Sequence, residues 1–113
     1  ERIRATTVAL EAGKTDTTLV DNLIYLLQKD ENTNVRLAAL NALLRFTDQP
    51  NVQDAMLTTI DSEGPLIVKI QLIETLVRLE DERLLPYLKS LEEDDSIPLQ
   101  LRDAAKLATF KLS

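Results

Sequence analysis

Three cationic residues, Arg45, Arg78 and Lys111, recur along the chain at equal intervals. A second set recurs at the same interval: Arg36, Lys69 and Arg102. Cations held in a row are suited to binding an acidic peptide or an acidic protein surface. The chain has no His and no Cys, which excludes Ser-His and Cys-His nucleophile pairs, imidazole and thiolate metal sites, and disulfides. We therefore expect a non-enzymatic protein with no catalytic residue, no metal site and no cofactor.

The charge balance argues against a nucleic-acid partner. The chain has 13 Lys and Arg against 19 Asp and Glu, which gives a net charge of −6 over 113 residues. Proteins that hold a phosphate backbone depend on Lys and Arg to displace its counterions. A nucleic-acid-binding helical repeat is therefore the disfavoured alternative to a protein-binding function.

The even spacing of the cations follows from an internal repeat. The pair Val35-Arg36 recurs as Val68-Lys69 and again as Leu101-Arg102, and a fainter copy, Ile3-Arg4, lies upstream. The period, about 33 residues, is typical of repeat architectures built from small helical units. We expect a single domain over residues 1–113, divided into a half-unit at 1–14 and repeats at about 15–47, 48–80 and 81–113.

Each repeat reads as two helices, because its apolar residues follow the i, i+3, i+4 spacing of a helical face. The first helix of the opening repeat is expected over residues 16–28, and the second helices over 34–46, 65–79 and 97–112. All four prolines fall at or near an expected helix start, where a missing backbone N–H costs nothing. The expected fold class is all-α: a short α-α superhelix of about three helix pairs plus one extra N-terminal helix.

The second helices are apolar on two sides, so each should be covered by neighbours on both flanks. In the last copy, Asp103 and Lys106 take the places of Ile70 and Ile73. A charged outer face is what a C-terminal capping repeat needs to remain soluble, and we expect the array to end there. Phe46 and Phe110 are expected in the packing, and Tyr25 is expected at the surface.

Only a narrow strip on each second helix stays polar, and this strip is the candidate binding surface. The strip holds Ala38, Asn41, Arg45, Gln71, Glu74, Arg78, Ala104, Leu107 and Lys111. Its candidate binding residues are Asn41, Arg45, Gln71, Glu74, Arg78 and Lys111. The alternative is that the three cations stabilise the carboxyl ends of their helices, by ~0.3–1 kcal/mol each, without binding any partner.

The stretch from Asp30 through Val35-Arg36 to Ala42-Leu43 resembles the D-x-x-x-x-V-R-x-x-A-x-x-A-L pattern of the HEAT-repeat family. The resemblance implies an α-solenoid that serves as a protein-binding scaffold. It also implies a structural ladder between repeats, made by an acid in the turn and a cation six residues later. Its residues here would be Asp30 with Arg36, Glu63 with Lys69, and Arg102, for which the third copy has Ser96 in place of the acid.

Residues 32–40, together with Arg45-Phe46, are also similar to the HEAT domains of bacterial anti-sigma-factor-like membrane proteins. This resemblance implies an extracytoplasmic regulatory or sensory domain of a membrane-anchored protein, with a cytoplasmic location as the alternative. The zinc-binding segment and the membrane helix that precede the repeats in those proteins are not in this sequence. We expect a protein or peptide partner, no membrane contact by this stretch of chain, and a monomer.

Overall fold

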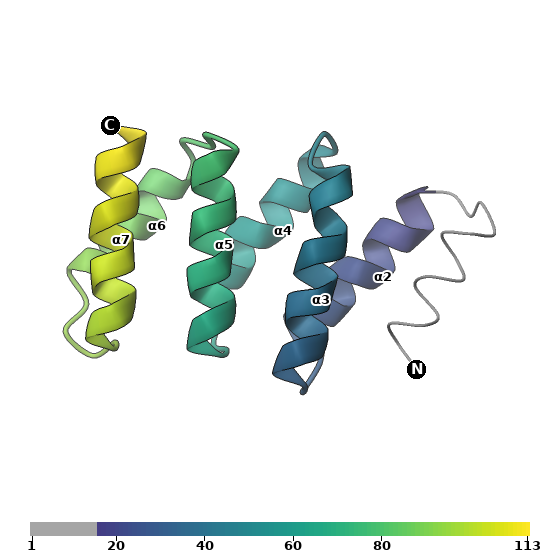
Figure 1. Cartoon of the computed structure of the whole chain (residues 1–113), viewed down its shortest axis with the longest axis horizontal. Coiled ribbons are helices and arrows are strands. Elements are labelled where there is room, and N and C mark those ends of the chain that lie inside the picture. Colours follow the sequence, from purple (N-terminus) through teal and green to yellow (C-terminus); the bar gives the residue numbers. More distant parts are fainter. Residues whose placement is uncertain (1–15) are drawn as a thin grey trace. The chain divides into compact units, whose positions relative to one another are not determined.

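The computed structural model describes residues 16–113, and within them every regular element is helical (Figure 1). The elements are α2 (Asp16–Lys29), α3 (Thr33–Leu43), the short 3-10 helix η1 (Leu44–Phe46), α4 (Pro50–Ile60), α5 (Leu66–Arg78), α6 (Leu84–Glu92) and α7 (Leu99–Leu112). The expected all-α class is confirmed. The expected second helices correspond to α3 with η1, to α5 and to α7. The expected half-unit at 1–14 lies outside the described residues.

The chain divides into two compact units, Glu1–Ala55 and Met56–Ser113, and the boundary falls within α4. In the first unit α2 packs against α3. The core of this unit is aliphatic and includes Leu23, Leu27 and Leu43, each at most 1% exposed. The amide of Gln28 donates to the backbone oxygen of Ala55 at 3.4 Å, which connects α2 to the first half of α4.

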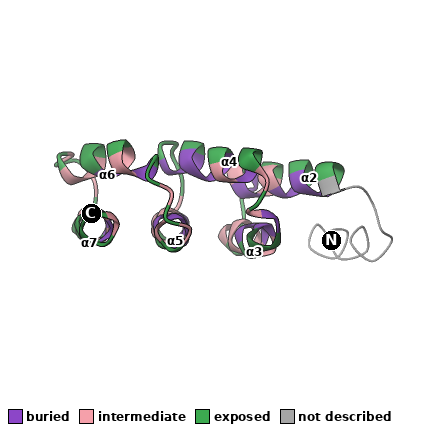
Figure 2. Cartoon of the chain, turned by 90° about the horizontal axis from the view of Figure 1, so that it is seen from above, coloured by how far each residue is buried: buried purple, intermediate pink, exposed green. Residues whose placement is uncertain are grey.

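In the second unit α7 packs against both α5 and α6. Figure 2 shows α5 and α7 side by side in one layer, with α6 in the other layer. The buried core joins side chains from α5, α6 and α7, among them Leu72, Leu76, Leu84, Leu88 and Leu101. This packing fixes α5 and α7 next to each other along their length.

The helix starts are set by prolines and by one polar cap, as the sequence predicted. Pro50 is the first residue of α4, Pro65 and Pro98 are the N-cap residues of α5 and α7, and Pro86 lies in the first turn of α6. The α3 helix instead begins after Asn32, whose side-chain oxygen accepts the backbone N–H groups of Asn34 and Val35 at 2.8 and 3.3 Å. Such a cap satisfies N–H donors that have no partner within the helix.

The α5 helix ends in a Schellman motif with an unusual residue at its left-handed position. Glu80 has a φ of 55°. The N–H of Glu80 donates to the carbonyl of Val77 at 3.0 Å, and the N–H of Asp81 donates to the carbonyl of Leu76 at 3.1 Å. Glycine is the usual residue here, because a side chain costs energy at positive φ.

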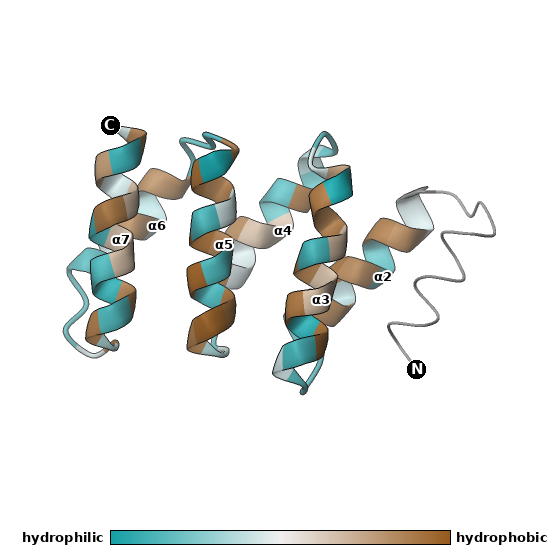
Figure 3. Ribbon diagram, viewed as in Figure 1, coloured by the Kyte–Doolittle hydropathy of each residue, from teal (hydrophilic) through white to brown (hydrophobic). Residues whose placement is uncertain are grey.

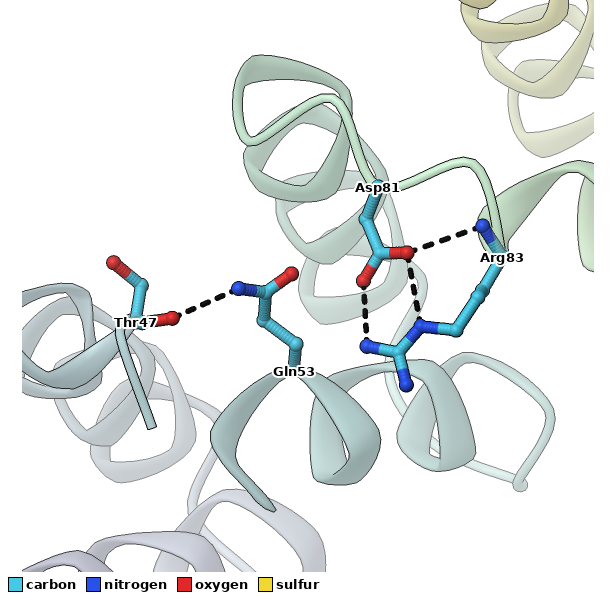
Figure 4. Close-up of polar contacts among 4 residues, drawn as sticks. All are labelled: Thr47, Gln53, Asp81 and Arg83. Atoms are coloured by element: carbon cyan, nitrogen blue, oxygen red, sulfur yellow. Dashed lines mark hydrogen bonds and ion pairs between the residues drawn. The ribbon is translucent and has the colours of Figure 1, made fainter. Parts of the chain in front are cut away.

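Polar side chains brace the segments that follow η1 and α5, as the close-up in Figure 4 shows. After η1, the amide of Gln53 donates to the backbone oxygen of Thr47 at 2.8 Å. After α5, the carboxylate of Asp81 accepts from the Nε and Nη2 atoms of Arg83 at 3.0 and 2.8 Å, and from its backbone N–H at 3.1 Å. The hydrogen bond from the Arg83 guanidinium lowers the pKa of Asp81.

Candidate functional site

A pocket of about 260 Å³ opens between α5 and α7. We call it the α5–α7 groove. Its lining comes from α5 through Ile73, Glu74, Val77 and Arg78, and from α7 through Ala104, Leu107, Ala108 and Lys111. The lining residues advance together along both helices, so the groove follows the direction of the two helix axes.

The groove is hollow because α7 presents short side chains at its centre. Ala104 and Ala108 lie one helical turn apart on the face turned towards α5, and Ala108 is buried. Opposite them, Ile73 is 1% exposed and forms an apolar floor. Longer side chains at the two alanine positions would fill the volume between the helices.

The rim of the groove is charged, and its positive charges gather at one end. Arg78 is the last residue of α5 and Lys111 lies in the last turn of α7, so two cations mark the carboxyl-terminal end of the groove. Glu74 lies one turn earlier on α5, and all three are exposed. Neither cation forms an ion pair with another residue of the described range 16–113. The groove therefore offers an apolar floor beside free positive charge.

The other residues of the predicted binding strip lie elsewhere. Gln71 is half-buried on α5 and does not line the groove. Asn41 on α3 and Arg45 on η1 are exposed in the first unit. The structure thus brings together Glu74, Arg78 and Lys111, and the full strip stays a prediction. Ala104 and Leu107 lie on the predicted strip, but neither they nor Ala108 were named as binding residues, because apolar side chains carry no chemical signal in a sequence.

The first predicted rung of the structural ladder is linked within one turn. The Nε of Arg36 donates to the backbone oxygen of Asp30 at 2.6 Å. The carboxylate of Asp30, which is 6% exposed as a residue, accepts the backbone N–H of Asn32 at 2.8 Å. The acid and the cation of this rung therefore meet through a main-chain oxygen.

The other two rungs differ from the first. No hydrogen bond or ion pair joins Glu63 and Lys69 within the described part of the chain. Arg102 pairs through Nη1 with the exposed carboxylate of Asp95 at 3.1 Å, and its buried Nε has no hydrogen-bond partner there. The ladder between repeats stays a prediction.

In the third turn the acid that organises the backbone is Asp94. Its carboxylate accepts both the hydroxyl and the backbone N–H of Ser96, at 2.5 and 2.9 Å, and these bonds lower the pKa of Asp94. The ladder pattern places the acid six residues before Arg102, at position 96, where this chain has Ser96. The shared signal is an aspartate two residues before a polar residue, as in Asp30 and Asn32, which is the sequence pattern of an Asx turn.

Among the aromatic residues, one prediction is wrong. Phe46 is buried and Tyr25 is 65% exposed, as expected, but Phe110 is 79% exposed. The counterpart of Phe110 one repeat earlier is Val77, which lies on an apolar side of α5 and is half-buried. Phe110 differs because no helix of the second unit covers the same side of α7.

Two further kinds of site are absent from residues 16–113. No group of three or more Asp or Glu residues in this range is arranged to hold a metal ion. None of the helices in the same range has the length and apolar character needed to span a membrane.

Comparison with known proteins identifies the repeat. A family model described as HEAT repeats matches residues 20–108. Since the match covers most of the chain, the protein belongs to the HEAT-repeat family. HEAT repeats generally mediate protein–protein interaction, and the family is typically a non-enzymatic scaffold. No curated protein and no solved structure matches the chain.

Proposed function

We propose that the chain is a non-enzymatic protein-interaction module whose α5–α7 groove binds an acidic, partly apolar segment of a partner protein. The observation that carries the proposal is the pair of cations, Arg78 and Lys111, at one end of a groove with an apolar floor; neither forms an ion pair with another residue of the range 16–113.

The size of the groove suits side chains of a peptide. At about 260 Å³ it lies below the roughly 300–1,000 Å³ of pockets that enclose a small-molecule ligand or cofactor. One aliphatic or aromatic side chain of a partner would bury itself against Ile73, Val77 and Leu107. Full burial of such a side chain contributes roughly 1.5–3 kcal/mol.

The charges set the kind of segment and its orientation. Exposed cations add little affinity by themselves, roughly 0–1 kcal/mol each, but they select an acidic partner and speed its approach. Glu74 repels acids one turn away from the Arg78 and Lys111 end. We therefore expect the bound segment to place its acidic residues at the carboxyl-terminal end of the groove and its apolar residue near Glu74.

Selection from a random peptide library tests the proposal. The library is selected on the wild-type protein, and the enriched peptides are then measured against the double variant Arg78→Glu, Lys111→Glu. We expect enrichment of acidic peptides with one large apolar residue, and binding weakened by about tenfold or more in the variant. The matched control Lys29→Glu, Lys89→Glu makes the same change of net charge at two exposed lysines outside the groove.

Equal binding by wild-type protein and the Arg78→Glu, Lys111→Glu variant would overturn the proposal, provided both keep the same helical content. A further variant, Glu74→Gln, removes the repulsive carboxylate from the rim. It should tighten binding of the selected acidic peptides by roughly two- to fivefold, in keeping with the removal of one exposed like charge.

We further propose that this module is the regulatory part of a membrane-anchored protein of the anti-sigma-factor-like type. The support for this is the similarity of residues 32–40 to the HEAT domains of such proteins. The test is the gene sequence that precedes the codon for Glu1. A Cys-rich segment followed by one membrane helix is the expected finding, and another helical repeat pair in that position would contradict it.

A further inference from the structure

The outer side of α7 carries large apolar residues that remain exposed. Leu99 is 58% exposed and Phe110 is 79% exposed. Between them lie two exposed residues of opposite charge, Asp103 and Lys106. Residues 99, 103, 106 and 110 follow the 4-3-4 spacing of a seam along one side of a helix. We call this seam the outer face of α7.

The outer face is separate from the surfaces that α7 uses within its own unit. Ala104 and Ala108 face α5 across the groove, and the fully buried residues Leu101 and Ala105 lie on the remaining inner side. The side chains of Asp103 and Lys106 form no hydrogen bond or ion pair with any other residue between 16 and 113. Figure 3 shows hydrophilic and hydrophobic bands in succession along α7.

The order of residues on this face is self-complementary. In an antiparallel pair of α7 helices related by a two-fold axis, the residues at positions i and j meet when their numbers add to a constant. A constant of 209 places Asp103 of one copy against Lys106 of the other, and Leu99 against Phe110. All four residues of the face are then matched at once, twice over by symmetry. A parallel pair would instead place Asp103 against Asp103 and Lys106 against Lys106.

We propose that the outer face of α7 binds a second copy of this chain, with the two α7 helices antiparallel and Asp103 paired with Lys106 across the two-fold axis. The interface is isologous, as in most dimers of identical chains. Leu99 and Phe110 are about 16 Å apart along the helix axis, at 1.5 Å per residue. At a shallow crossing angle of about 20° both apolar pairs stay within reach.

The dimer is weak, because one helix seam buries much less than the roughly 1,200–2,000 Å² of a stable interface. We expect a dissociation constant of roughly 10 µM to 1 mM. The proposal replaces the monomer expected from the sequence. It does not depend on the α5–α7 groove, whose cations are Arg78 on α5 and Lys111 on another side of α7.

Charge reversal tests the pairing by sedimentation analysis of the whole chain from about 10 µM to about 1 mM. Each single variant, Asp103→Lys or Lys106→Asp, gives the face one sign of charge and should be monomeric throughout. An equimolar mixture of the two should form a dimer again, because their faces are then complementary. The double variant Asp103→Lys, Lys106→Asp should self-associate like the wild type, since the exchange preserves the pairing.

Cysteine cross-linking tests the antiparallel orientation. The chain contains no Cys of its own, so only the introduced residues can form disulfides. Under oxidation, a mixture of Leu99→Cys and Phe110→Cys proteins should form a disulfide-linked dimer at least about tenfold faster than either protein alone. Both positions are exposed, so neither change removes core packing. A wild-type protein that stays monomeric at about 1 mM would overturn the proposal. Faster cross-linking of Leu99→Cys with itself than with Phe110→Cys would do the same.

Discussion

The helices α5 and α7 occupy equivalent places in successive repeats, yet the same side of the two helices has opposite character. On α5 this side carries Ile73, which is 1% exposed, and Val77, which is half-buried. At the equivalent positions α7 carries Lys106 and Phe110, and both are exposed. Burial at these positions therefore depends on the neighbouring helix as much as on residue type, since Phe110 is large and apolar and is nevertheless 79% exposed.

The contrast also explains why the groove lies where it does. On the side turned towards α5, α7 carries alanines, and on the facing side α5 carries Ile73 and Val77. Large residues on one helix and small residues on the other leave a hollow between the helices. The cations at its end come from the last turns of both helices.

The largest change in stability is expected at Ile73, the buried residue of the pair Ile73 and Lys106. Ile73→Ala should lower the free energy of unfolding by about 2–4 kcal/mol, because it removes buried methyl groups and leaves a cavity. Lys106→Ala, at the equivalent position on α7, should change it by less than about 0.5 kcal/mol. Urea denaturation at a protein concentration where the chain is monomeric measures both. Similar losses in the two variants would show that the two sides are equally packed.

A smaller effect is expected at the contact between α6 and α7. The Thr109 hydroxyl lies 2.6 Å from Oε2 of Glu92, whereas the equivalent position on α5 is the fully buried Leu76. Thr109→Val keeps the shape and removes the hydroxyl, which can donate to Glu92 and, at 3.0 Å, to the backbone oxygen of Ala105, so it should lower the free energy of unfolding by about 1 kcal/mol. The same loss should appear in Glu92→Ala, and the double variant should lose little more than either single one. Additive losses would mean that the two side chains do not interact.

At the carboxyl end of α5, one substitution is expected to raise the free energy of unfolding, not to lower it. Glu80 has a positive φ, and glycine accepts this conformation without a side-chain penalty. Glu80→Gly should therefore raise the free energy of unfolding by about 0.5 kcal/mol, after the greater chain entropy of glycine in the unfolded state is counted. Glu80→Val should lower it by about 1 kcal/mol, because a β-branched residue fits this region worst. Thermal denaturation of the two variants checks the order, and a stabilising valine would contradict it.

The smallest effect concerns Asp81, the aspartate that precedes α6. The Arg83 guanidinium lowers the pKa of Asp81, so the stability that this contact contributes is present above the unfolded pKa of about 3.9 and is lost as the pH falls through the lower folded value. Asp81→Asn should cost a few tenths of a kcal/mol at pH 7, since Arg83 is mostly exposed. The difference from wild type should shrink below about pH 4. A difference that persists unchanged at pH 2 would assign the effect to the backbone instead.

The sequence predicted the helices well because their signals are local. The period of apolar residues and the four prolines define where the helices begin, and Asp103 and Lys106 marked a side of α7 that stays exposed. Phe110 was misplaced because a large apolar side chain was expected to be packed, although it shares a side of α7 with the exposed residues Asp103 and Lys106. The third copy was seen to lack an acid six residues before Arg102, and the structure shows why: the turn before α7 is longer than the turn before α3, and its organising acid, Asp94, lies two residues before Ser96.

The candidate site could be predicted only in its charged half. Glu74, Arg78 and Lys111 share one strip by helical geometry, and this can be read from their spacing. The hollow between the helices depends on how closely α5 and α7 approach and on the short side chains of Ala104 and Ala108. That approach is a property of the packed core, which no single helix encodes.

Methyl NMR during titration with a selected acidic peptide tests whether the α5–α7 groove is the binding surface. The methyl signals of Ile73, Val77 and Leu107 should shift in proportion to binding, while those of Leu19 and Leu23 in α2 and of Leu99 on the outer face of α7 stay in place. Shifts centred on Leu99 or on α2, with Ile73 and Leu107 unchanged, would contradict it.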